Sequence, residues 1–185
     1  MRQEVRGRIA NLGQDSRRVS DKAICRGLSS LAGEQPFVFV LGYLALPDEV
    51  RVDDFLSEMA TAGKRIVVPR VHAGRLRFAE WHPDVVLSRD EKGVLAPAGE
   101  VNTEMPGGSG LMLVPGRAFD CEGRRLGRGG GYYDALLASL PGTIVHAGIS
   151  YACQIFEAVP QEDHDRSVEI VVTEAGVIRA PKVRR

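Results

Sequence analysis

The sequence predicts an α/β fold of three layers, in which helices cover both faces of an open, Rossmann-like and mostly parallel sheet. Two patterns carry this prediction. Continuous apolar runs such as residues 37–41 are typical of strands buried on both faces, and these runs alternate along the chain with helical patterns. A chain of 185 residues is long enough for one sizeable core. We therefore expect a single domain over residues 1–178, followed by a frayed and basic tail over residues 179–185.

Two helices are expected at the start of the chain, within residues 2–32. Apolar side chains recur there at spacings of three and four, as they do on one face of a helix. Ser20 is a candidate N-cap for the second helix. Pro36 then ends the helical pattern, so the apolar run over residues 37–41 is predicted to be the first strand.

The next segment has a strand–helix–strand pattern. A helix is expected over residues 52–59, with Gly63 as its C-terminal stop. A short strand is expected over residues 66–68, and Pro69 is expected to end it. A crossover of this kind places its two strands parallel to each other.

The rest of the chain continues the alternation of strands and helices. Residues 76–79 are a candidate antiparallel partner for the preceding strand, and residues 83–109, rich in Pro, Gly and charge, are interpreted mainly as a loop. Four further elements are expected: a strand over residues 111–114, a helix over residues 132–140, and strands over residues 144–148 and 168–172.

The charge balance excludes two classes of partner. Lys and Arg number 24, as do Asp and Glu, so the formal net charge is zero. A chain without a positive excess has no built-in attraction for nucleic acid or for an anionic membrane, and we expect neither as a partner. Any anion site must therefore be local, and we expect its positive charge in the glycine-rich segment and the N-terminal helix.

The cysteines and the apolar runs bear on the compartment. Cys25, Cys121 and Cys153 are an odd number and lie far apart in the sequence, which fits no complete disulfide framework and no metal knuckle. The N-terminal residues lack the apolar stretch of a secretory signal, and the run over residues 37–46 is about half of what a membrane helix needs. We therefore expect a protein of the reducing cytoplasm.

A glycine-rich segment is the strongest candidate for chemistry. Nine of the 21 glycines lie within residues 107–131, between a predicted buried strand and a predicted helix. Glycines let the backbone approach a ligand closely, and a helix N-terminus adds N–H donors, so this segment could hold phosphate beside Arg124, Arg125 and Arg128. It matches neither a P-loop nor a Rossmann fingerprint. Glycine and charge content alone leave a flexible turn with solvated arginines as an equal alternative.

The full string around these glycines is more specific. VPGRAFD over residues 114–120, followed by GRRLGRGGGYYD over residues 123–134, resembles the signature of the 5-formyltetrahydrofolate cyclo-ligase family, also called 5,10-methenyltetrahydrofolate synthetase. Weaker matches occur in order along nearly the whole chain, including RQEVR over residues 2–6, Glu49-Val50, and the segment that contains Asp165.

The resemblance implies a reaction. It implies that ATP and Mg²⁺ drive the cyclisation of 5-formyltetrahydrofolate to 5,10-methenyltetrahydrofolate, with release of ADP and phosphate. Phosphorylation of the formyl oxygen would give an imidate-like phosphate whose carbon is attacked by N10 of the folate. In phosphoryl transfer the protein mainly positions the partners and neutralises charge, so no nucleophilic triad is required.

The resemblance also implies roles for individual residues. Arg125 and Arg128 are the expected catalytic residues, and Asp134 and Asp165 are the expected Mg²⁺ ligands. The folate is expected at Glu49, Tyr132 and Tyr133. The expected ATP-binding residues are Arg2, Arg6, Arg125, Gly127, Arg128, Gly129, Gly130, Gly131, Tyr132, Tyr133 and Asp134.

Structural explanations stand beside three of these assignments. Asp134 could merely complement a helix N-terminus, Asp165 could cap a turn, and Glu49 could be a solvated loop charge. If Asp134 acts only on the metal, then Asp134→Ala should weaken Mg²⁺-dependent activity with little loss of stability.

The chain also departs from the family pattern. Arg2 stands where Lys is usual, Ala96 where a Glu usually precedes a Pro, and Gly110 where Asp is common. These departures support an alternative function: a catalytically altered paralogue that acts as a nucleotide- or folate-binding regulatory protein.

Overall fold

The computed structural model describes residues 1–99, 105–162 and 165–181. Its elements follow in the order α1 (Arg2–Ala10), α2 (Gln14–Glu34), β1 (Phe39–Leu41), α3 (Asp53–Thr61), β2 (Arg65–His72), β3 (Arg75–Glu80), β4 (Leu87–Arg89), β5 (Leu95–Pro97), β6 (Gly110–Pro115), β7 (Ala118–Phe119), β8 (Arg125–Leu126), α4 (Tyr132–Ser139), β9 (Ile144–Ile149), the short 3₁₀ helix η1 (Ala152–Gln154), β10 (Ile170–Thr173) and β11 (Gly176–Arg179).

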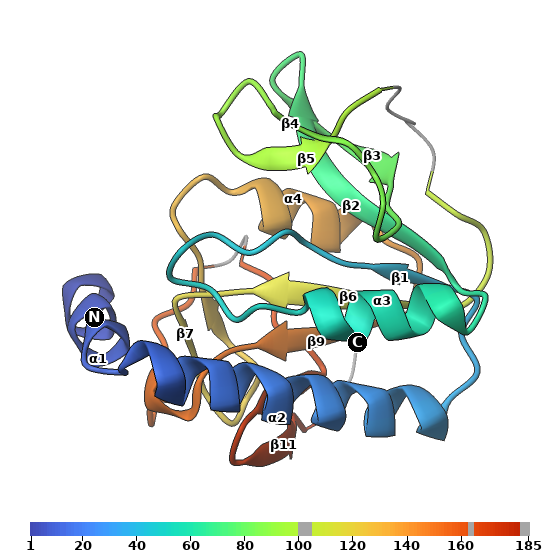
Figure 1. Ribbon diagram of the computed structural model, residues 1–185. Coiled ribbons are helices and arrows are strands. Elements are labelled where there is room, and N and C mark those ends of the chain that lie inside the picture. The colour runs from blue at the N-terminus through green and yellow to red at the C-terminus, as the bar shows by residue number, and fades with distance from the viewer. Residues whose placement is uncertain (100–104, 163–164, 182–185) are drawn as a thin grey trace.

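A seven-stranded sheet in the order β11–β10–β9–β6–β1–β2–β3 forms the centre of the molecule (Figure 1). The strands β10, β9, β6, β1 and β2 run parallel to one another. The two edge strands, β3 and β11, pair antiparallel with their neighbours. The predicted mostly parallel sheet is therefore confirmed.

Helices cover both faces of this sheet, as predicted. Because successive side chains of a strand point to opposite faces, the inner strands feed two separate apolar clusters. Val40, Leu111 and Leu113 pack in one cluster with α1, α2 and α3. Met112 and Val114 pack in the other with Leu136 and Leu137 of α4. The result is the expected three-layer arrangement.

The helices lie close to their predicted positions, with one error at a cap. α3 and α4 occupy the expected ranges, and Gly63 follows α3 with a φ of 77°, which suits a C-terminal stop. The Ser20 cap was wrong. α2 begins at Gln14 after Gly13, so Ser20 lies inside the helix and is buried. The first turns of α2 are largely exposed and lack the apolar spacing that marks its later part.

The strands differ from prediction mainly where pairing, not composition, decides. β2 does not end at Pro69 but continues to His72, paired with β3. Pro69 lies beyond the last pair between β1 and β2, at Leu41 and Val67, so its missing N–H removes no bond to β1. The expected loop over residues 83–109 contains β4 and β5, which form a small antiparallel sheet; its residues 100–104 lie outside the described residues.

The strand order places a topological switch point between β1 and β6. From β1 the chain crosses through α3 to β2 on one side, and from β6 it crosses through α4 to β9 on the other. In open α/β sheets, the crevice beyond the carboxyl ends of two such strands is where ligands bind. The glycine-rich segment follows β6 directly, so the fold places it at this crevice.

The C-terminal segment begins in order. Arg179 belongs to β11, and its guanidinium pairs with Glu34 of α2 at 2.5 Å. The ordered part therefore extends past the expected boundary at residue 178. Residues 182–185 of the expected tail lie outside the described residues. Among the residues that are described, no helix combines the length and apolar character needed to cross a membrane.

Candidate active site

A cleft of about 970 Å³ opens at the switch point. It has two unlike sides. The side that we call the polar wall consists of Glu49, Arg125 and residues 127–134. The side that we call the apolar wall consists of Pro69, Val71, Leu76, Val94 and Leu95, from β2, β3 and the β4–β5 hairpin. In Figure 1, β2 and β3 rise past the end of the sheet toward β4 and β5.

The backbone of the polar wall depends on glycine at two positions. Gly129 has a φ of 97° and Gly131 a φ of 68°, in the left-handed region that side chains other than glycine rarely adopt. Gly131 is also the N-cap of α4, and its carbonyl accepts the first helical bond, from Ala135 at 3.0 Å. The turn at Gly131 therefore aims the N-terminus of α4 at the cleft, where its N–H donors and dipole favour an anion.

Arg125 and Asp134 form an ion pair at the base of the polar wall. Arg125 Nη2 donates to Asp134 Oδ1 at 2.6 Å, and the Arg125 side chain is only 3% exposed. The guanidinium also lies 5.9 Å from the centre of the Tyr133 ring. Burial raises the pKa of Tyr133 well above its ordinary value of 10.0. Tyr133 therefore presents a neutral hydroxyl and an aromatic face to the cleft.

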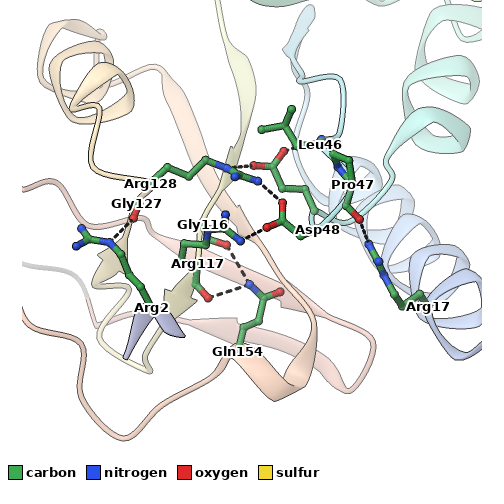
Figure 2. A network of polar contacts seen from close by, with 11 residues as sticks. Arg2, Arg17, Leu46, Pro47, Asp48, Gly116, Arg117, Gly127, Arg128 and Gln154 are labelled. Carbon is green, nitrogen blue, oxygen red and sulfur yellow. Dashed lines mark hydrogen bonds and ion pairs between the residues drawn. The ribbon is translucent and has the colours of Figure 1, made fainter. Parts of the chain in front are cut away.

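Arg128 joins the two loops that follow β1 and β6. Its Nε donates to Glu49 Oε1 at 2.9 Å, and its Nη2 contacts Asp48 (Figure 2). Asp48 also pairs with the buried Arg117. Burial alone raises the pKa of the Asp48 carboxyl, but hydrogen bonds and charges of Arg117 and Arg128 outweigh burial and lower the pKa below its ordinary value. Asp48 is therefore ionised near neutral pH.

The N-terminal helix contributes one of its two predicted arginines. Arg2 lines the cleft, and its Nε donates to the carbonyl oxygen of Gly127 at 3.3 Å (Figure 2). Arg6 lies exposed on α1 and is not part of the cleft lining. Both residues are on one helix, but only Arg2 is near the glycine-rich loop.

The two predicted metal ligands lie near each other. Asp134 and Asp165 both line the cleft, and the backbone N–H of Arg166 is 3.5 Å from Asp134 Oδ1. Asp165 Oδ2 accepts the Glu162 N–H at 2.8 Å. Within residues 1–99, 105–162 and 165–181, no group of three or more His, Cys, Asp or Glu side chains could hold a metal. A metal here would therefore draw most of its ligands from water or a bound phosphate.

The expected concentration of positive charge in the glycine-rich segment is wrong. Arg124 pairs with Asp120, Arg125 pairs with Asp134, and Arg128 pairs with both Asp48 and Glu49. Each of the three arginines thus has a carboxylate partner, which the sequence could not show for Arg128 because Asp48 and Glu49 precede it by about 80 residues. The ligand-free polar wall is an ion-pair network.

Three site residues were missed. Asp48 and the buried Arg117 form part of the network, and the side-chain amide of Gln154 donates to the carbonyl oxygens of Gly116 and Arg117, at 3.0 and 2.9 Å (Figure 2). An acidic pair that soon follows a buried strand was a signal for Asp48. The apolar wall was also missed, because nothing in sequence separates its residues from core.

The two departures that favoured a regulatory paralogue lie outside the cleft lining. A side chain at Gly110 would meet the Phe39 ring, with a Cβ only 2.3 Å away, so glycine there allows Phe39 to pack. Ala96 is buried in β5, between the lining residue Leu95 and Pro97. Neither substitution removes a side chain from the cleft surface.

Comparisons with known proteins agree with this site. A family model described as the 5-formyltetrahydrofolate cyclo-ligase family matches residues 1–174. The chain is 31% identical over 140 residues to the 5-formyltetrahydrofolate cyclo-ligase of Escherichia coli K12, covering 73% of this chain and 77% of that one. It is 30% identical over 152 residues to the mouse protein of the same name, covering 71% of each.

Solved structures show the same fold. The 5,10-methenyltetrahydrofolate synthetase of Aquifex aeolicus superimposes with a TM-score of 0.81 at 30% identity, covering 100% of this chain and 93% of the other. A 5,10-methenyltetrahydrofolate synthetase from Mycoplasma pneumoniae has a TM-score of 0.68 at 22% identity, with coverage of 93% and 94%. The second likeness supports the fold alone.

Proposed function

The chain belongs to the 5-formyltetrahydrofolate cyclo-ligase family and is therefore an enzyme, and we propose that it cyclises 5-formyltetrahydrofolate to 5,10-methenyltetrahydrofolate with ATP and Mg²⁺. One observation carries the proposal beyond family membership. A single cleft sets a glycine-rich loop and a helix N-terminus opposite an apolar wall. A polyphosphate and a flat aromatic substrate suit these two surfaces, and the reaction needs both in one cavity.

The proposed chemistry activates a poor leaving group. The formyl oxygen attacks the γ-phosphorus of ATP, the bond to the β,γ-bridging oxygen breaks, and ADP leaves. N10 of the folate then attacks the formyl carbon of the resulting imidate phosphate. Phosphate departs with the former formyl oxygen, and N10 loses its proton, which leaves the five-membered methenyl ring. The protein's part is to align the two substrates and stabilise the charge on the phosphoryl group.

We propose that the polar wall binds the nucleotide. The N–H groups at the start of α4 and the glycine-rich backbone face the phosphates, and Arg2 reaches them from α1. Arg125 and Arg128 stabilise charge at the transferred group. We leave Arg6 out of the site because it does not line the cleft. The nucleotide-binding residues we propose are Arg2, Arg125, Gly127, Arg128, Gly129, Gly130, Gly131, Tyr132, Tyr133 and Asp134.

We propose that the folate lies between Glu49 and the apolar wall. The carboxylate of Glu49 can accept hydrogen bonds from N–H groups of a heterocycle, and Oε2 is held in place by the Leu46 N–H at 3.0 Å. Tyr132 and Tyr133 supply aromatic faces at the junction of the two walls. Val71 and Leu76 cover the other face of the substrate.

The residues present fit Mg²⁺. This ion takes one or two protein carboxylates and completes its octahedron with phosphate oxygens and water, and two carboxylates, Asp134 and Asp165, line the cleft beside each other. The described contacts of Asp134 are made at Oδ1, so Oδ2 is the oxygen we assign to the metal. When bound, the ion would neutralise charge on the β- and γ-phosphates.

We place the enzyme in the reducing cytoplasm, with no nucleic acid or membrane partner. Cys25, Cys121 and Cys153 are all free thiols in the structure, which suits that compartment. The placement follows from cysteine usage and net charge, as set out from the sequence.

A spectrophotometric assay tests the proposed function. Purified protein mixed with 5-formyltetrahydrofolate, ATP and Mg²⁺ should generate the methenyl absorbance, and omission of ATP should abolish it. Arg128→Ala should lower the rate, whereas Arg179→Ala, which removes an arginine from an exposed ion pair outside the cleft, should not. Folded protein that forms no methenyl product would refute the proposal and favour the regulatory alternative.

A further inference from the structure

Asp48 bridges two arginines of very different exposure. Oδ2 pairs with Arg117 and Oδ1 pairs with Arg128 (Figure 2). The Arg117 side chain is 8% exposed, whereas that of Arg128 is 38% exposed and lines the cleft. Asp48 itself is not part of the cleft lining. One carboxylate therefore connects a buried cation to a cation that can meet a ligand.

The buried end of this bridge is fixed. The Arg117 N–H donates to the Leu126 carbonyl oxygen at 2.7 Å, and the Arg117 carbonyl oxygen accepts from Gln154 Nε2 at 2.9 Å. Gln154 is 2% exposed, and its amide also holds the carbonyl oxygen of Gly116. The backbone of Arg117 is thus held on both sides, so its guanidinium is a stationary anchor for Asp48.

The turn that carries Asp48 is fixed as well. Arg17 of α2 donates from Nη2 to the Pro47 carbonyl oxygen at 2.6 Å (Figure 2). Across the same turn, the Glu49 N–H donates to the Leu46 carbonyl oxygen at 2.9 Å. Asp48 is therefore held through its backbone and its side chain, and Arg128 is the mobile partner that this arrangement can restrain.

We propose that Asp48 is a positioning residue, which holds the Arg128 guanidinium in place for the nucleotide phosphates. This inference rests on the proposed function, in which Arg128 binds those phosphates. Glu49 cannot serve as the permanent anchor because it lines the cleft, where it is the proposed folate ligand. Asp48 keeps its contact when both substrates are bound. It also separates two like charges, since without it Arg117 would repel Arg128 from its position.

The opposite effect is the main competing explanation. If Asp48 merely competes with phosphate for Arg128, its removal should strengthen nucleotide binding. If Asp48 serves only to neutralise the buried Arg117, its removal should lower stability without an effect that depends on Arg128. Measurements of nucleotide affinity separate these cases.

The first test is calorimetric titration of ATP and Mg²⁺ into wild-type protein and Asp48→Asn. We expect the dissociation constant to rise about fivefold, and the KM for ATP to rise more than that for 5-formyltetrahydrofolate. Asp53→Asn is the matched control, because Asp53 pairs with the exposed Arg51 and does not line the cleft. Its affinity should equal that of wild type. An unchanged or tighter affinity in Asp48→Asn would overturn the proposal.

The second test asks whether Asp48 acts through Arg128. In an Arg128→Ala background, Asp48→Asn should change the ATP dissociation constant by less than about twofold. An equal loss in both backgrounds overturns the positioning role. If Asp48→Asn unfolds because Arg117 is left unpaired, the double variant Asp48→Asn/Arg117→Gln removes both charges and should show the same loss of affinity.

The outcomes for wild-type protein separate this inference from the proposed function. Wild-type protein that binds no ATP would refute the proposed function, and the positioning role with it. Wild-type binding together with an affinity of Asp48→Asn that matches wild type would refute the positioning role alone.

Discussion

The polar wall and the apolar wall of the cleft are held in place by different interactions. In the polar wall, Arg125 and Arg128 are fixed by carboxylates, two of which come from the distant turn after β1. In the apolar wall, the β4–β5 hairpin is tied to β2 through Asp90, which accepts the N–H groups of Val71 and Val94, both at 3.0 Å. The polar wall therefore depends on charge, and the apolar wall depends on strand geometry and shape.

This difference teaches where each wall is vulnerable. Removing one charge from the polar wall leaves its partner without compensation in a partly buried place. Trimming one side chain of the apolar wall removes contact area and leaves the backbone ties intact. Substitutions in the two walls should therefore affect different substrates and differ in size.

The largest effect is expected from Asp134→Ala. The sequence alone suggests little loss of stability, but the structure places Asp134 against Arg125, whose side chain is 3% exposed. Loss of the carboxylate leaves a buried cation, so chemical denaturation should show a decrease of about 3 kcal/mol in the free energy of unfolding. Turnover should fall roughly a hundredfold or more.

Asp53→Ala is the control for Asp134→Ala. It removes a carboxylate from the exposed pair with Arg51, so the free energy of unfolding should change by less than about 1 kcal/mol. Equal losses in the two variants would show that the polar wall does not depend on its buried charges.

Gly129→Ala is expected to be next in size. At a φ of 97°, an alanine is strained, and the nearest atom to its Cβ would be Arg2 Nη2 at 3.9 Å, so the cost comes from the backbone alone. We expect about 1–2 kcal/mol, measured as an ATP affinity about tenfold weaker or as an equivalent loss of stability. Gly33→Ala, in α2 with open space around it, should be neutral or slightly stabilising.

Leu76→Ala should act on the other substrate. Trimming this side chain removes apolar contact from the folate side of the cleft, so the KM for 5-formyltetrahydrofolate should rise about fivefold, while the ATP dissociation constant stays the same. Leu87→Ala, an exposed leucine of β4 outside the cleft lining, should change neither value. A shift in ATP affinity for Leu76→Ala would contradict the separation of the two walls.

The smallest effect is expected from acid. Because the folded protein lowers the pKa of Asp48 below 3.8, its ion pairs contribute stability above pH 3.8 that is lost as the pH falls through the lowered pKa. Denaturation measured between pH 5 and pH 3 should therefore show a shallower pH dependence in Asp48→Asn than in wild type. Leu76→Ala should keep the wild-type pH dependence. Identical slopes in all three proteins would mean that Asp48 contributes no pH-dependent stability.

The inner part of the fold was predictable because burial on both faces leaves a mark in the sequence. The strands β1, β6 and β9 appear as continuous apolar runs, and the crossover through α3 predicted parallel pairing. The edge strand β11 is mostly exposed, and β7 and β8 have two residues each. Such strands are defined by their partners and carry no apolar run, so the sequence offered no signal for them.

The candidate site was predictable where its residues are consecutive. The segment from Gly127 to Asp134 is a single string, and all of it lines the cleft. Contacts across long separations were not predictable. Arg128 meets Asp48 and Glu49 only because the fold places β1 beside β6, and Val71 and Val94 meet only through the β4–β5 hairpin.

The unequal lengths of β1 and β2 have a consequence for how this cleft can change. The last pair of β1 with β2 is at Val67, whereas β2 continues to His72. Those extra residues extend for roughly 17 Å at the usual rise per residue, and they act as a ruler for the depth of the binding site. Because their side chains alternate between faces, insertions or deletions of two residues in each arm of the β2–β3 hairpin would lengthen or shorten the site and keep its surface, while a change of one would replace that surface with its reverse side.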